Sequence, residues 1–204
     1  MGYECLLAGL PELHTGQHAP ISIEALDEQL NETVSESDME LIELLRRTPQ
    51  DEKVFEDGLK VKNDFLRNWY TFNLDLNNIL VAAICRKHKM PLKGQIVGNN
   101  EVAETLREDR GQKDFGLTGV VDDYESIMRL LNIDNLQERE KQLDAIRFAW
   151  LEENTLFIDF SIENVLAYYL ESQMLNRWTK LNPEDGERIF RAMVADMKKD
   201  VKFE

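Results

Sequence analysis

Residues 61–83 carry apolar side chains at steps of three and four residues, and this stripe limits the fold of the chain more than any other feature. Its members are Val61, Phe65, Trp69, Phe72, Leu76, Ile79 and Ala83. A mean step of about 3.5 residues places them on one face of an α-helix. Pro91 and Gly94 end the pattern. It therefore predicts a helix that begins near Asp57 or Asn63 and is roughly 40 Å long.

Helical patterns cover most of the remaining chain. They span residues 22–31, 37–46, 101–108, 123–132, 136–154 and 161–179, and Asn182 followed by Pro183 begins a last one. Ser37, with Glu40 three residues later, predicts a capping box, and Asn135 predicts an N-cap. Only YECLLAGL (3–10) and GLTGVV (116–121) are compatible with short strands. The sequence thus predicts an all-α fold, an antiparallel helical bundle with short loops.

A weak internal similarity relates the two halves of the chain. DLNNILVAA (75–83) can be aligned with SIENVLAYY (161–169), which pairs Asn78 with Asn164. Each half would then contain one central helix with an asparagine at the same place. We interpret residues 1–204 as a single helical unit with two pseudo-repeated lobes, near residues 1–108 and 109–204.

Polar residues interrupt the most apolar part of the long helix. Asp75, Asn77 and Asn78 lie in the middle of WYTFNLDLNNILVAAICRKHKM (69–90), and Asn164 takes the matching place in the second half. A reactive carboxylate at Asp75 would need a second titratable group nearby, whereas this stretch offers only amides. Because buried polar groups find hydrogen-bond partners, we interpret all four residues as structural locks between helices.

The charge balance restricts the partners. The 204 residues carry a net charge of −15 at pH 7. Such a chain repels phosphate backbones, so we expect no nucleic-acid partner, and a basic protein surface fits better. The longest apolar run, residues 79–85, is far below the roughly 20 residues that cross a bilayer, so no direct membrane insertion is expected. Two cysteines give no disulfide framework, which favours a cytoplasmic protein.

Four residues are candidates for contacts with a protein partner. Arg86, Lys87 and Lys89 form a basic cluster at the end of the long helix, and Trp178 lies at the edge of an apolar helix face. The cluster could hold an acidic partner or a phosphate, or could simply be a solvated helix end that complements the helix dipole. Trp178 could be a binding residue or part of the core.

No motif predicts catalysis or a bound cofactor. His14 and His18 are four residues apart, but Gly16 lies between them and no carboxylate ligand accompanies them, so we expect no metal site. The spacings of phosphate-binding loops, zinc sites and nucleophile triads are absent from the sequence. We therefore predict no catalytic residue, no metal and no cofactor, and a protein that is not an enzyme.

Six segments, in this order, resemble a bacterial family of unknown function that is encoded in operons of V-type (V/A-type) ATP synthases. They are LLAGLPEL, GLKVKNDFLRNWYTFNLDLNNILVAAICRKHKM, IVGNNEVAETLRE, DFGLTGVVDDYESIMRLL, EREKQLDAIRFAWLEENTLFIDFSIENVLAYYLE and RWTKLNPEDGERIFRAMV. The family is in turn similar to the rotor-coupling component of these ATPases, which is named C in the V/A-type enzymes and d in the eukaryotic enzyme. That component is an all-helical protein that joins the rotor shaft to the membrane ring.

Three hypotheses follow for the function. The resemblance implies a non-catalytic central-stalk coupler of a V-type ATPase, bound to the rotor shaft and the membrane ring and so peripheral to the inner membrane. An assembly or regulatory factor of the same complex is the alternative. The third hypothesis is an enzyme with a hidden carboxylate cluster, which would require acidic residues to converge in a pocket, for example Asp75 with Glu152 or Glu163.

Overall fold

The computed structural model describes residues 2–48, 52–108, 111–122 and 124–180, and helices dominate these ranges. The helices are α1 (Glu4–Gly9), α2 (Ile23–Thr33), α3 (Glu36–Arg47), α4 (Glu52–Gly58), α5 (Asp64–Lys87), α6 (Glu101–Glu108), α7 (Tyr124–Leu130), α8 (Leu136–Thr155) and α9 (Ile162–Lys180). The described ranges contain no strand, only an isolated bridge between Thr118 and Val121. The predicted all-α fold is confirmed.

Most helix starts follow from side-chain caps that the sequence reveals. The Asn63 side chain accepts a hydrogen bond from the Leu66 amide at 2.9 Å and begins α5, one of its two predicted starts. Asn135 caps α8 in the same way, as predicted. The predicted start of α3 at Ser37 is wrong, because Ser35 provides the cap and accepts from the Asp38 amide at 3.3 Å.

Neither of the two segments that were compatible with short strands forms a strand. Residues 4–9 form α1, not a strand, because among the described residues no second segment forms a ladder with them and their backbone groups pair locally. GLTGVV forms turns around the isolated bridge. The helix predicted after Asn182 lies outside the described residues. Among the described helices, none combines the length and the apolar character needed to cross a membrane.

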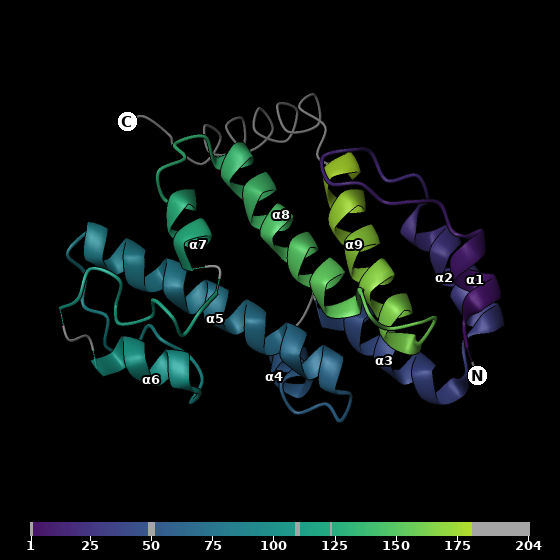
Figure 1. The fold of residues 1–204 in the computed structure, drawn as a ribbon, viewed down its shortest axis with the longest axis horizontal. Helices are drawn as coiled ribbons and strands as arrows, with labels where there is room; N and C mark the ends of the chain where they lie inside the picture. Colours follow the sequence, from purple (N-terminus) through teal and green to yellow (C-terminus); the bar gives the residue numbers. More distant parts are fainter. Residues whose placement is uncertain (1, 49–51, 109–110, 123, 181–204) are drawn as a thin grey trace, which may run out of the picture.

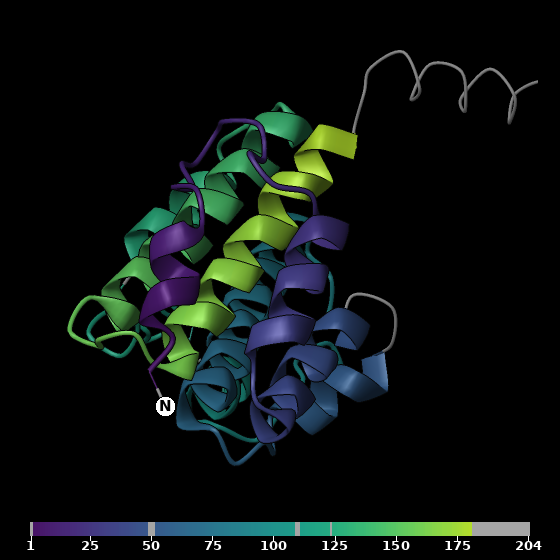
Figure 2. The same cartoon turned by 90° about the vertical axis from the view of Figure 1, so that its right-hand side faces the viewer.

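The long helix α5 organises the whole arrangement. Figure 1 shows α6 and α7 near its C-terminal end and α3 and α4 near its start, with α8 and α9 side by side above it. The turn at residues 156–161 joins α8 to α9 as an antiparallel hairpin. Figure 2 shows α9 between α1 and α2. The helix of 24 residues therefore contacts α4, α6, α7 and α9.

The apolar core consists of two clusters that meet on α5. The first joins α2, α3 and α4 to the start of α5, the end of α8 and α9. The second joins the remainder of α5 to α6, α7 and Leu143 of α8. Phe72 packs against both, and its ring stacks on Trp150 at 5.3 Å between centroids. Each cluster contains residues from before and after position 108, so the two clusters do not coincide with the predicted lobes. The division into lobes 1–108 and 109–204 stays a prediction.

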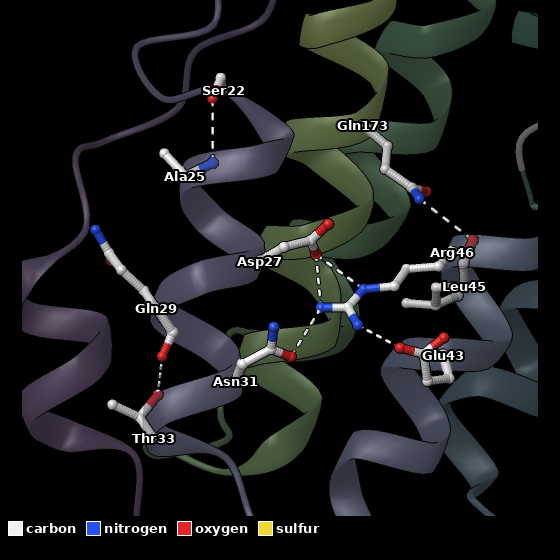
Figure 3. A network of polar contacts seen from close by, with 10 residues as sticks. All are labelled: Ser22, Ala25, Asp27, Gln29, Asn31, Thr33, Glu43, Leu45, Arg46 and Gln173. Atoms are coloured by element: carbon white, nitrogen blue, oxygen red, sulfur yellow. Dashed lines mark hydrogen bonds and ion pairs between the residues drawn. The ribbon is translucent and has the colours of Figure 1, made fainter.

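A network of polar contacts connects α2, α3 and α9 (Figure 3). Arg46 Nε donates to Asp27 Oδ1 at 2.9 Å, and its guanidinium also pairs with Glu43 and Asn31. Gln173 Nε2 of α9 donates to the Leu45 carbonyl at 3.2 Å. All of these groups have partners within the chain, so we assign the network to packing and not to a site.

Candidate functional site

The predicted lock residues of α5 have different environments. Asn78 is buried, and its Nδ2 donates to the Val97 carbonyl at 2.7 Å while its Oδ1 accepts from the Val97 amide at 3.0 Å. Asp75 is half-buried and accepts a hydrogen bond from Asn100 Nδ2 at 2.7 Å. Both residues thus attach the loop before α6, and the start of α6, to the long helix. Asn77 is exposed on the same helix.

Asn164 has a local role. It lies in the first turn of α9, and its Oδ1 accepts from the Ser161 amide at 3.1 Å. Asn78, in contrast, lies deep inside α5 and bonds to a loop. The two asparagines aligned by the internal similarity therefore occupy unequal positions, because one closes a helix start and the other is in a helix interior.

The three carboxylates considered for catalysis do not line one common groove. Asp75 lines a groove of about 350 Å³ with Asn68, Thr71 and Asn154, and burial raises its pKa. Neither Glu152 nor Glu163 belongs to the described lining of that groove. Glu163 instead accepts from Ser161 and, at 3.1 Å, from Asn63 Nδ2.

Glu171 is a carboxyl group with a strongly raised pKa. It is half-buried on α9 and shares a groove with Tyr168, and burial raises its pKa to about 8, with the negative charge of Glu152 acting in the same direction. Tyr168, whose pKa burial also raises, donates its hydroxyl to the Pro11 carbonyl at 2.9 Å. Sequence reasoning missed Glu171 because a single glutamate in an apolar helix carries no spacing signal.

Trp178 is half-buried and belongs to a charge network centred on one buried carboxylate. Asp144 of α8 is buried and accepts from Trp178 Nε1 at 2.7 Å and from Arg177 Nη2 at 2.5 Å. Arg147 Nη1 donates to the other oxygen of Asp144 at 3.1 Å, and its Nε donates to Asn73 of α5 at 2.9 Å. This chain of contacts connects α5, α8 and α9. A partner contact at Trp178 stays a prediction.

The predicted basic cluster is larger in space than in sequence. Arg86 and Lys87 line a groove of about 550 Å³, and Lys113 and Arg129 line it with them. Its apolar lining is Ala83, Phe115, Met128 and Leu131, and Tyr124, Glu125 and Asn132 complete it. We call this the basic groove. Lys89 is exposed beyond the end of α5 and is not part of the described lining.

Arg86 is held in place within the basic groove. Its guanidinium carbon lies 3.4 Å from the centroid of the Phe115 ring, and its Nη1 donates to the Lys113 carbonyl at 2.9 Å. Lys113 and Arg129 come from the 111–122 loop and from α7, so sequence spacing could not have joined them to Arg86. The contact between Arg86 and the buried Phe115 ring is a cation–π interaction, and it fixes a positive charge on the groove wall.

The turn between α8 and α9 exposes large apolar side chains. Leu156 is 70 % exposed, Phe157 is 91 % exposed and Phe160 is 44 % exposed. We call these three residues the hairpin tip. The turn is nevertheless tied to the fold, because the Tyr3 amide donates to the Phe160 carbonyl at 2.7 Å and Asn164 closes the start of α9. Sequence reasoning placed this segment in a motif but did not identify its exposure.

Comparison with known protein families gives a match over most of the chain. Residues 51–201, more than half of the chain, match a protein family described as "Protein of unknown function (DUF2764)". The match includes α4 to α9, and with them the basic groove and the hairpin tip. Neither the curated proteins nor the solved structures gave a match.

Proposed function

Because the chain belongs to the family described as "Protein of unknown function (DUF2764)", whose description assigns no activity, we propose its function from the segment resemblance and from its exposed surfaces. It is a non-catalytic component of a bacterial V-type ATPase, a coupler of the central stalk between rotor shaft and membrane ring. The protein works in the cytoplasm, on the face of the inner membrane to which the ATPase is bound.

The hairpin tip is the observation that carries this proposal. A phenylalanine that is 91 % exposed next to a leucine that is 70 % exposed is costly in water and is typical of a surface that another protein covers. The tip lies within WLEENTLFIDFSIENVLAYYL, part of a segment that carries the resemblance. Glu152, Glu153 and Asp159 surround it in sequence and are exposed, so the partner surface would be apolar at its centre and basic at its rim.

The helical frame suits a mechanical role. α5 has 24 residues, which corresponds to roughly 36 Å at the rise of an α-helix, and it packs into both core clusters. A displacement applied at one end of such a helix is transmitted to the other end, because close-packed cores deform little. A stalk coupler requires this stiffness and requires no reaction centre.

A comparison of variants tests the proposal. The tagged protein, with Phe157→Ser and with Leu136→Ser as the matched control, would be expressed in its own cells and recovered from membranes in mild detergent. Leu136 is 66 % exposed at the opposite end of α8, so both variants remove one exposed apolar side chain. We expect the wild type and Leu136→Ser to recover the stalk proteins and Phe157→Ser to lose most of them.

Two results would contradict this assignment. Recovery without any ATPase component would remove the ATPase role altogether. Equal recovery with Phe157→Ser would show that the hairpin tip is not the contact. Wild-type recovery in trace amounts only, relative to the shaft proteins, would favour the alternative of an assembly or regulatory factor.

A further inference from the structure

We propose that the basic groove binds an acidic, amphipathic segment of a partner protein. The groove lies at the C-terminal end of α5, against α7 and the 111–122 loop. The inference depends on the proposed function only for the source of the partner, which would be another protein of the ATPase. The binding chemistry follows from the groove itself.

The charge of the basic groove opposes that of the whole chain. The chain has 39 acidic and 24 basic residues, yet the described residues that line the groove include four cations and a single carboxylate, Glu125. Glu125 lies 3.9 Å from Arg129, and both side chains are mostly exposed. This weak ion pair therefore leaves most of the positive charge of the groove uncompensated. Because charges farther away than about 8 Å are screened at physiological salt, a ligand in the groove interacts mainly with these four cations, opposed by Glu125 and by the nearby Asp114.

The apolar lining specifies more than an anion. Met128 and Leu131, both half-buried, line the groove beside the cations, whereas Phe115 is buried beneath the guanidinium of Arg86. Inorganic phosphate would use the charges alone and leave the apolar surface wet. A segment with carboxylates on one side and apolar side chains on the other would use both.

Tyr124 provides a second, independent indication of a ligand. It lines the groove, it is only 6 % exposed, and its hydroxyl has no hydrogen-bond partner among the described residues. A buried hydroxyl without a partner is unfavourable, and because this oxygen is itself shielded from solvent, a carboxylate would accept from it only once the bound segment displaces the side chains that cover it. Burial and the negative charge of Asp114 raise the pKa of the Tyr124 phenol, while the positive charge of Arg86 lowers it.

Nucleic acid fits the groove poorly. Single strands bind through bases stacked on accessible aromatic rings, whereas Phe115 and Tyr124 are 3 % and 6 % exposed. The four lining cations also form one compact group, while nucleic-acid sites follow a phosphate backbone over many charges. An acidic protein segment is therefore the better occupant.

Fluorescence anisotropy of the purified chain with labelled helical peptides tests the proposal. The probe peptide has glutamates on one face and leucines on the other. One comparison peptide replaces the glutamates by lysines, and a second replaces the leucines by alanines. We expect the probe to bind in a salt-dependent way and both comparison peptides to bind at least about tenfold more weakly.

Variants locate the binding. Lys87→Glu combined with Arg129→Glu changes two exposed groove cations, and Lys60→Glu combined with Lys62→Glu makes the same charge change at exposed residues before α5. We expect about a tenfold or larger loss for the first pair and no change for the second. Tyr124→Phe, which removes only the hydroxyl, should also weaken the probe. Circular dichroism would confirm that each variant is folded.

The outcomes separate this inference from the proposed function. Equal binding of the glutamate and lysine peptides, or an equal loss with both variant pairs, would overturn it. So would full binding of the alanine peptide with displacement by inorganic phosphate, which would indicate a simple anion site. If the probe binds as expected and no ATPase component is recovered from cells, the groove inference holds and the proposed function fails.

Discussion

A single side chain, Asn78, positions the loop before α6. The buried amide satisfies both backbone groups of Val97, so the loop can be attached to the helix without any backbone pairing. The sequence indicated this role because an asparagine inside an apolar stripe requires a partner. It could not indicate which loop provides the partner, since that depends on the tertiary fold.

Asn78→Ala should lower the free energy of unfolding by about 1–3 kcal/mol, because two hydrogen bonds of a buried amide are lost and Val97 is left unpaired. Chemical denaturation followed by circular dichroism measures this change. Asn77→Ala is the matched control on the exposed side of the same helix and should change the value by less than about 0.5 kcal/mol. Equal effects of the two substitutions would contradict the assignment.

Glu171 makes the stability of the chain depend on pH. Its pKa in the folded chain is raised from 4.5 to about 8, so the folded state binds this proton more tightly than the unfolded state does. Stability is therefore retained below pH 4.5 and decreases as the pH rises through this window, because ionisation is disfavoured in the folded chain.

Glu171→Gln should remove this loss of stability. We expect the variant to be more stable than the wild type by about 1–4 kcal/mol above pH 8, and the two to be similar near pH 4.5. Denaturant unfolding at a series of pH values provides the measurement. A difference that does not change with pH would show that Glu171 ionises as it does in water.

At the scale of elements, the caps show what local sequence determines. Asn63 and Asn135 begin their helices where the sequence places them. At α3, both Ser35 and Ser37 satisfy the local rule, and the turn before the helix selects Ser35, which has the extended backbone that an N-cap needs. The two hydroxyl oxygens lie 3.1 Å apart.

Ser35→Ala should therefore destabilise the chain by about 1 kcal/mol, because the Asp38 amide loses its cap. Ser37→Ala, inside the same helix, should have an effect below about 0.5 kcal/mol. Thermal unfolding of both variants makes the comparison. A larger loss of stability in Ser37→Ala than in Ser35→Ala would indicate that Ser37 is the N-cap.

The candidate sites were less predictable than the helices, for a physical reason. Helix periodicity is a local signal, and it predicted α5, α8 and α9 closely. The basic groove needs Lys113 and Arg129 beside Arg86, and the hairpin tip needs the turn to face away from both core clusters. Both depend on how helices pack, which no single stretch of the chain encodes.

At the scale of the whole molecule, α5 links the two core clusters into one structure. Leu106 is fully buried in the second cluster, while Trp69 and Trp150 pack in the first. Because the two clusters share a helix, unfolding of one exposes the other.

Leu106→Ala should accordingly shift one common transition, with a cost of about 2–5 kcal/mol. Tryptophan fluorescence reports mainly on the first cluster and circular dichroism on all helices, so the two curves should coincide in the wild type and move together in the variant. An unchanged fluorescence transition would indicate two independent lobes.

The most direct test of the central claim is the number of copies in the assembled ATPase. The tagged chain would be purified at native expression from its own membranes, and quantitative mass spectrometry would compare its amount with that of the central-shaft proteins. The stalk-coupler account predicts nearly equal amounts. Recovery without any ATPase component would contradict it.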